Sequence, residues 1–428
     1  MKNITIFIDS YNDVDHILPF IDYVLLNQKA NIFLYTTKIN NLSSCKDHLY
    51  YLKNTYGLTT INYDQNFSRK YSMFMNMYLK LSDFSHKAKQ NSSLLPFLML
   101  LTWLRPIAAY LTQQEVNKAQ KDICSSVIMM DFGKELSLNG TAIVKYGQKN
   151  NVTVLGYLHG FGIYTNLDTL EKDRSVLSPI KTFILKIVKL SRVDSVYFDR
   201  YLVGVDQRNT LYSSSQMANF NKQYLYKVLE IGVPRFTYEW INKYKKHVVH
   251  SNRFTYGDND RINVVLFMSH PQYNVNLDQL IATIDKLSSC NNINFVCKPH
   301  TRNGLDRIKS EWLNGGYDAS KINSLSLSSW ADVGIVYGSS IAFQLLQDKV
   351  PLIMPKYIHT NTTIFEENDA CILANNLNDL MDILSHSKED VFDMVDHKSI
   401  NNLIKHYVYG DTNYNGLMSN FYHSVVDK

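Results

Sequence analysis

Short apolar runs alternate along the chain with longer segments in which apolar residues recur every three or four positions. Runs of the first kind predict buried strands, and segments of the second kind predict helices. In the first half, strands are expected at Ile4–Ile8, Ile32–Thr36, Thr59–Tyr63, Val127–Asp131, Val152–Leu158, Val196–Val203 and Val228–Ile231. Helices are expected over residues 14–28, over most of 68–120 with breaks near Pro96 and Pro106, and through Ile143 and Val144. Such alternation indicates a parallel, doubly wound sheet.

The same alternation begins again in the second half. Strands are expected at Asn263–Met268, Ile293–Cys297, Val333–Val336, Pro351–Met354 and Ala370–Ala374. Helices are expected over 276–288, near 305–314, from Ser339-Ser340 to about Asp348, and near 377–385 and 397–407. We therefore predict an α/β protein with two Rossmann-like domains that face a shared cleft. The predicted divisions are residues 1–235, a linker over 236–261, residues 262–390, and helices within 391–428 that pack back toward the first domain. Ligands of such sheets bind at the carboxyl ends of the strands.

The composition of the chain argues against several classes of function. An apolar content of 45% and a charged content of 19% are those of a globular protein. The formal net charge of +5 is mild, and no basic run with interleaved aromatics supports a nucleic-acid partner. The five cysteines form no C-x-x-C pair, which favours a reducing, cytoplasmic location. We expect no secretory signal, and no uncharged run reaches the roughly 20 residues that a membrane span requires.

The segment 333–355 reads as a strand, a tight turn, a helix and a second strand. Gly338 permits the turn, and Ser339 and Ser340 then begin the helix. Two hydroxyl groups beside the backbone N–H groups and the positive dipole end of a helix suit a phosphate group. A plain N-cap uses the same residues, so the pattern leaves both interpretations open.

A second loop follows the strand that ends at Cys297. It carries Lys298, His300 and Arg302 around a proline that fixes the turn. Three potential donors just beyond a strand suit a phosphate or pyrophosphate. A solvated basic loop is the alternative.

A polar segment follows the strand predicted at Pro351–Met354. Its residues His359, Asn361 and Glu366 could hold a ribose or the edge of a base. Glu366 could equally be a first-turn acid of a helix, where a carboxylate is favoured by the dipole.

Candidate acids and bases lie at three strand ends of the first half. His159 follows a predicted strand and precedes two flexible positions, Gly160 and Gly162, so its imidazole could accept a proton from an acceptor hydroxyl. Asp9 and Asp131 each end a strand and could also act as bases. The alternatives are a histidine that caps a strand end and aspartates that cap helices.

No metal-ligand spacing and no nucleotide-binding or hydrolase motif of known type is found, so we expect neither a metal nor another cofactor. The segment 178–192 places Lys181, Lys189 and Arg192 near one side of a predicted helix. A basic amphipathic helix of this kind can lie on a membrane surface. An ordinary surface helix of a Rossmann domain has much the same pattern.

The motifs His159-Gly160, Lys298-Pro299-His300 and Tyr337-Gly338-Ser339-Ser340 occur in this order. Together they resemble the landmarks of two-domain (GT-B) transferases that build bacterial surface polysaccharides. This group includes the CDP-glycerol glycerophosphotransferases of teichoic acid and capsule synthesis, and related transferases that use CMP-activated sugars. The resemblance spans roughly residues 150–375. Thr301 after His300, in place of a proline, and the absence of a Thr-Pro-Leu-Lys continuation after His159 leave the donor open between a polyol phosphate and a sugar.

The resemblance implies that His159 is the base and that His300, Ser339 and Ser340 bind the phosphates of the donor. It also implies a nucleotide-activated donor, a lipid-linked glycan acceptor, and a place in the cytoplasm or at the inner face of the cell membrane. We expect a metal-independent mechanism because no metal-ligand spacing is recognised. Two alternatives are a nucleotide-sugar 2-epimerase of the same fold and a non-catalytic subunit of a polysaccharide assembly complex.

Overall fold

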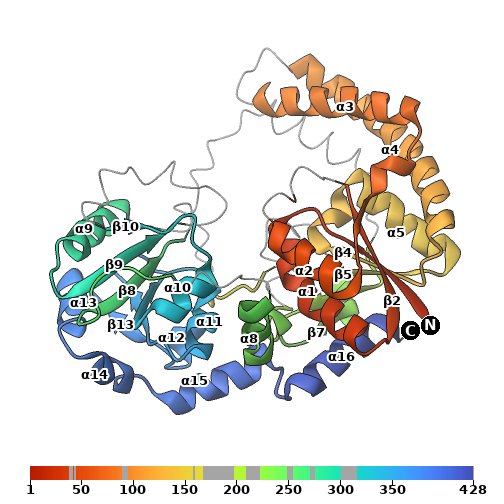
Figure 1. Cartoon of the computed structure of the whole chain (residues 1–428). Coiled ribbons are helices and arrows are strands. Elements are labelled where there is room, and N and C mark those ends of the chain that lie inside the picture. The colour runs from red at the N-terminus through yellow and green to blue at the C-terminus, as the bar shows by residue number, and fades with distance from the viewer. Residues whose placement is uncertain are drawn as a thin grey trace.

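The structure is a computed structural model that describes residues 1–37, 42, 45–88, 95–157, 160–166, 197–208, 222–247, 254–269, 275–299 and 316–427. Two parallel sheets lie side by side within these residues, one in each half of the chain (Figure 1). The predicted fold class, two Rossmann-like α/β units, is confirmed.

The first sheet has the strand order β3-β2-β1-β4-β5-β6-β7, and all its pairs are parallel. Its strands are β1 (Lys2–Phe7), β2 (Ala30–Thr36), β3 (Thr60–Asn62), β4 (Val127–Asp131), β5 (Thr153–Tyr157), β6 (Arg200–Val203) and β7 (Val228–Glu230). The helices of this half are α1 (Tyr11–Leu26), α2 (Lys46–Tyr56), α3 (Arg69–Ala88), α4 (Leu95–Ile123), α5 (Leu138–Asn150) and α8 (Tyr238–His247). Every residue of β4 is buried, as expected for a strand with helices on both faces.

The second sheet repeats this plan with the order β10-β9-β8-β11-β12-β13. Its strands are β8 (Ile262–Phe267), β9 (Ile293–Lys298), β10 (Tyr317–Asp318), β11 (Val333–Val336), β12 (Leu352–Pro355) and β13 (Ile372–Ala374). Its helices are α9 (Leu277–Ser288), α10 (Ser324–Trp330), α11 (Ile341–Gln347), α12 (Ile364–Glu367), α13 (Leu377–Ile383), α14 (Lys388–Asp393) and α15 (His397–Leu403). The helix expected near 305–314 lies outside the described residues.

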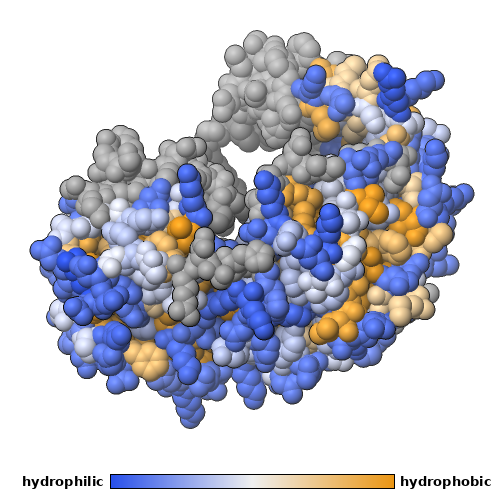
Figure 2. Space-filling model, viewed as in Figure 1, coloured by the Kyte–Doolittle hydropathy of each residue, from blue (hydrophilic) through white to orange (hydrophobic). Residues whose placement is uncertain are grey.

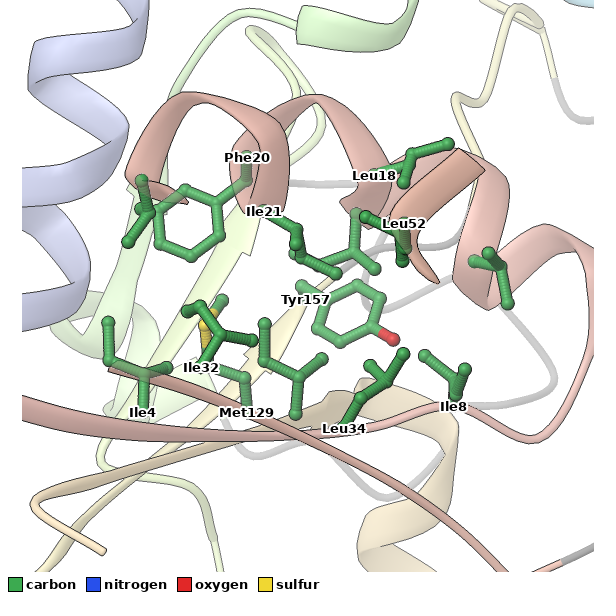
Figure 3. Close-up of a cluster of buried hydrophobic side chains, with 14 of the residues drawn as sticks. Ile4, Ile8, Leu18, Phe20, Ile21, Ile32, Leu34, Leu52, Met129 and Tyr157 are labelled. Atoms are coloured by element: carbon green, nitrogen blue, oxygen red, sulfur yellow. The ribbon is translucent and has the colours of Figure 1, made fainter. Parts of the chain in front are cut away.

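The core of the first half lies between its sheet and α1 (Figure 3). Leu18, Phe20 and Ile21 of α1 face aliphatic side chains of β1, β2 and β4. The ring of Tyr157 lies among them, and its hydroxyl donates a hydrogen bond to the carbonyl of Phe7 at 3.1 Å. Burial of an aliphatic side chain contributes about 1.5–3 kcal/mol, so this layer fixes the strand ends that carry the candidate site.

The expected break near Pro106 is wrong, because α4 passes through that residue without interruption. A proline inside a helix removes one hydrogen bond and crowds the preceding turn. Packing of α4 against α3 and α5 offsets that cost. Pro96 lies in the first turn of α4, where the missing N–H would have no partner in any case.

The segment expected to be a linker contains the helix α8. Its side chains Trp240, Ile241 and Tyr244 are buried in the core of the first half. The last helix, α16 (Tyr414–Val426), packs on α1, and the rings of Phe421 and Phe20 lie 4.6 Å apart. Figure 1 shows α15 and α16 running from the second half back to the first. The exact domain divisions stay a prediction.

The described helices do not include one that could cross a bilayer, since none combines the required length with sufficient apolarity.

Candidate functional site

The strand order places the predicted Gly-Ser-Ser turn at a favourable position. In each sheet the order reverses between the first and fourth strands, which are β1 and β4 in one half and β8 and β11 in the other. Ligands of open parallel sheets bind just beyond the carboxyl ends of such strands. Gly338, Ser339 and Ser340 follow β11 directly and therefore lie at the reversal of the second sheet.

A cavity of about 420 Å³ lies between the two halves. Segments that follow β1, β5, β8, β9 and β11 all reach it. Its lining from the first half includes Tyr11, Asp15, His16, Gly160–Tyr164 and Arg235, and its lining from the second half includes Met268, Lys298, Pro299, Gly338, Ser339, Ser340 and Gln344. The fold therefore brings described residues of all three predicted motifs to one cavity: Gly160, Lys298-Pro299 and Gly338–Ser340.

The turn at Gly338 has the left-handed backbone that its sequence predicts, with a φ of +65°. A Cβ atom at this position would lie 2.0 Å from the hydroxyl oxygen of Tyr164 and 2.8 Å from that of Ser269. Ser269 also donates a hydrogen bond to the carbonyl of Gly338 at 3.2 Å. Only glycine fits between the two halves here.

The hydroxyl groups of the Gly-Ser-Ser turn take little part in capping α11. Ser340 precedes α11, and its side chain makes no capping hydrogen bond. Ser339 accepts only a long contact of 3.4 Å from the backbone N–H of Ile341. Because α11 is a short helix with a correspondingly small dipole, the two hydroxyls are the stronger contribution to any phosphate contact.

The loop after His159 is held firmly against the second half. Thr165 donates a backbone hydrogen bond to Thr362 at 3.0 Å, and Ile364 donates one to Ile163 at 2.9 Å. The ring of Tyr164 stacks on that of His359, with centroids 5.2 Å apart. His159 itself lies outside the described residues, as do His300, Arg302 and the segment 178–192.

Arg235 is a cation of this cavity that the sequence analysis missed. It follows β7 and forms an ion pair with Asp15 of α1. Burial opposes the charges of both groups, but their mutual attraction outweighs it, so the pKa of Asp15 is held well below its ordinary value and that of Arg235 is raised. Asp15 also contacts His48 at 3.4 Å, and His48 is bonded to the hydroxyl of Tyr244 at 2.7 Å. The position of Arg235 directly beyond a strand was the available sequence signal.

Gln344 and His16 were also missed. Gln344 is buried, and within the described residues its amide nitrogen has no hydrogen-bond partner. It lines the cavity one helical turn after Ser340, a spacing that puts both residues on one face of α11. His16 lines the same cavity from α1, next to Gly160. The cavity therefore carries an imidazole from the first half besides the predicted His159.

Lys298 has a different environment from the one expected. Its ammonium group donates hydrogen bonds to the carbonyls of Ala319, Ser320 and Ile322, at 3.1, 2.9 and 2.6 Å. All three donors of the ammonium are thus used to hold the loop that leads into α10. The predicted phosphate role of Lys298 stays a prediction, and the contacts observed are those of a loop anchor.

His359, Asn361 and Glu366 are not among the residues that line this cavity. Glu366 belongs to the capping box of α12, where it accepts from Thr363, and it pairs with Lys356 at 2.6 Å. His359 is buried behind Tyr164. The carboxylate of Glu366 therefore has the helix-start role that the sequence left open as the alternative.

Asp9 and Asp131 lie at the reversal of the first sheet and are also not among the residues that line the interdomain cavity. Asp9 faces a separate cavity of about 650 Å³ and pairs with Lys134 at 3.0 Å. Burial opposes the ionisation of Asp9, but Lys134 and hydrogen bonds from Thr37 outweigh it and lower its pKa. Asp131 accepts from the N–H of Gly133 at 2.9 Å, as a capping residue does.

The nearby Asp13 has a raised pKa, because it is buried and is repelled by Asp131. Among the described residues, no three His, Cys, Asp or Glu side chains form a group that could hold a metal ion.

No protein-family model and no curated protein matches the chain. Solved structures do match it in fold. A UDP-GlcNAc 2-epimerase from Neisseria meningitidis bound to UDP-GlcNAc is 10% identical, with a TM-score of 0.56 and 100% of each chain covered. A glycosyltransferase from Rickettsia africae ESF-5 is 12% identical, with a TM-score of 0.51, 100% of this chain and 99% of that chain covered. The glycotransferase of kitacinnamycin is 10% identical, with a TM-score of 0.53 and 99% of each chain covered.

Identities this low show the fold alone. The chain has the two-domain fold that these glycosyltransferases and nucleotide-sugar epimerases share, over its whole length.

Proposed function

We propose that the chain is an enzyme that binds a nucleotide-activated sugar or polyol in the interdomain cavity and transfers the activated group to a surface glycan. The observation that carries this proposal is the meeting of Gly338–Ser340 with the loop Gly160–Tyr164 and Arg235 around one cavity of about 420 Å³. The neighbours in fold support a nucleotide-sugar ligand, since one of them is bound to UDP-GlcNAc. We favour a CMP- or CDP-activated donor on the resemblance of the three motifs.

The proposed mechanism divides the work between the two halves. An acceptor hydroxyl attacks the activated carbon or phosphorus of the donor, its proton passes to the imidazole of His159, and the nucleotide leaves with the bonding electron pair. Ser339, Ser340, His300 and Arg302 would hold the leaving phosphate. Stabilisation of charge that develops on a leaving group is among the largest contributions to catalysis.

Arg235 has a supporting part in this scheme. Its charge is partly offset by Asp15, so it would orient the donor through directional hydrogen bonds more than through net attraction. The contacts of Lys298 point to a loop anchor. The proposed acceptor is a lipid-linked glycan, and a membrane contact through 178–192 belongs to this proposal as well.

A nucleotide-sugar 2-epimerase is the second candidate, and the similarity to the N. meningitidis epimerase supports it equally well. The two candidates differ in what they need. An epimerase converts its sugar without an acceptor, whereas a transferase leaves the donor intact until an acceptor is added.

The purified chain should first be screened against CMP-, CDP-, UDP- and GDP-linked donors by thermal shift, since a bound ligand raises the melting temperature by mass action. The stabilising donor is then followed by NMR, alone and with a glycan acceptor. Transfer that requires the acceptor supports our proposal, and an epimerised sugar from the donor alone contradicts it. A third candidate, a non-catalytic subunit, would produce normal glycan in cells that carry His159→Ala, whereas a catalytic base would not.

A further inference from the structure

The outer surfaces of α3 and α4 expose large apolar side chains. Met73 and Met77 of α3 are 72% and 51% exposed, and Ile107 and Tyr110 of α4 are 50% and 64% exposed. Single exposed apolar residues are ordinary, but a group of them on neighbouring helices marks an interaction surface. The two helices pack on each other, and α3 lies at the outer edge of the first half, while Val116 and Ala119 of α4 pack in the core beside the sheet (Figure 1).

Cations accompany the apolar residues of α3. Lys70, Met73, Met77 and Lys80 follow one another at spacings of three and four, so they share one exposed face. Arg69 is exposed beside them, and the sequence of α3 carries four Lys and Arg residues against one acid, Asp83. Figure 2 shows pale orange and blue side chains intermixed over this helix.

The opposite side of α3 is already occupied. Tyr71 is buried in the core, and Met75, Tyr78 and Leu79 line the cavity of about 650 Å³ that also contains Lys134. The outward face of α3 is therefore a second apolar surface, and it takes no part in the packing among the described residues.

From these observations we infer that the outer face of α3 and α4 docks on the headgroup layer of a bilayer that contains anionic lipids. A helix whose cations outnumber its acids complements negatively charged headgroups, and methionine and tyrosine side chains suit the boundary between headgroups and acyl chains. The sequence of α4 begins with residues 95–104, which carry no charge. Neither helix can span the bilayer, so the chain would lie on it.

This surface is distinct from 178–192 and does not depend on the proposed transferase activity. If that activity is correct, docking would hold the chain at the membrane that carries the acceptor.

The test is flotation of the full chain with vesicles of phosphatidylcholine, with and without phosphatidylglycerol. We expect binding that requires phosphatidylglycerol and weakens in high salt, because exposed charges are screened. The double variant Met73→Glu with Met77→Glu should lower the affinity roughly tenfold or more, since it removes apolar contact and adds repulsion. Lys70→Glu with Lys80→Glu should lower it similarly.

Met394→Glu is the matched control, because Met394 is an exposed methionine of the second half, 43% exposed, and its replacement should leave binding unchanged. A variant with Lys181, Lys189 and Arg192 changed to Glu tests the other segment. The inference is overturned if the unaltered chain does not float, if the α3 variants float normally, or if only the 178–192 variant loses binding. Analytical sedimentation of the same α3 variants tests whether a second copy of the chain, and not a membrane, binds this surface. A change from dimer to monomer with unaltered flotation would also overturn it.

Discussion

Gly338→Ala perturbs the contact between the two halves at the candidate site with the addition of a single methyl group. The backbone at Gly338 is left-handed, with a φ of +65°, and alanine in this conformation costs about 1–2 kcal/mol. The methyl group would also lie 2.0 Å from the hydroxyl oxygen of Tyr164. The tyrosine must therefore move and leave its stack on His359, at a further cost of about 0.5–1.5 kcal/mol.

Gly57→Ala is the matched control, because Gly57 has nearly the same φ, +68°, with no atom within 4 Å of an added Cβ. Both variants carry the backbone cost, so their difference measures the contacts with Tyr164 and Ser269. We expect Gly338→Ala to lower the free energy of unfolding by about 2–4 kcal/mol and Gly57→Ala by about 1–2 kcal/mol. Urea denaturation of both variants measures these values.

Removal of the Tyr164 hydroxyl should relieve part of the clash. In a double-mutant cycle, Gly338→Ala combined with Tyr164→Phe should be less destabilised than the sum of the single variants. Donor affinity should fall in Gly338→Ala and stay normal in Gly57→Ala, because only the first displaces a residue that lines the interdomain cavity. Equal destabilisation of the two glycine variants, together with strict additivity in the cycle, would refute this reasoning.

Two further predictions concern buried carboxylates. Burial raises the pKa of Glu135 to about 7, despite its hydrogen bonds from Tyr201 and Phe198. The folded state therefore binds a proton more tightly than the unfolded state does. The free energy of unfolding should fall by on the order of 3 kcal/mol as the pH rises from about 4.5 to 7. Urea titrations across this range should show the fall in the unaltered chain and not in Glu135→Gln, and an equal slope in both would be inconsistent with it. Glu366→Ala should cost about 1–3 kcal/mol of stability, because it removes a capping box and the partner of Lys356, while donor affinity stays unchanged; a selective loss of nucleotide affinity would instead support the ribose contact expected from the sequence.

Local patterns predicted every described strand except the short β10, together with the turn at Gly338 and the serines that follow β11. These features depend on residues close together in the chain, such as the β-branched run of β11. The helix α8 was missed because its apolar residues, Trp240, Ile241 and Tyr244, are dispersed among charged ones. The helix places these three residues on one face, and the structure shows that this face packs in the core of the first half.

Contacts between distant segments were beyond the sequence. Arg235 and Asp15 are 220 positions apart, and no local pattern links them. Lys298 shows the same limit from the other side: its type and place suit a phosphate, but three carbonyls of a later loop bind its ammonium group. A cation after a strand is a candidate ligand contact only when the fold leaves its donors available.

Calorimetric titration of the best-binding nucleotide-linked donor tests the central claim most directly. Ser339→Ala with Ser340→Ala removes two hydroxyls from the cavity, and each lost hydrogen bond to a charged group costs about 1.5–3 kcal/mol, or roughly tenfold to a hundredfold in affinity. Ser387→Ala, which removes the cap of α14, is the control for a lost serine. We predict strongly weakened donor binding in the double variant and normal donor binding in both Ser387→Ala and His159→Ala. Of these last two variants, only His159→Ala should lose turnover. Unchanged affinity in the double variant, or an equal loss in it and His159→Ala, would contradict the assignment of the interdomain cavity as the donor site.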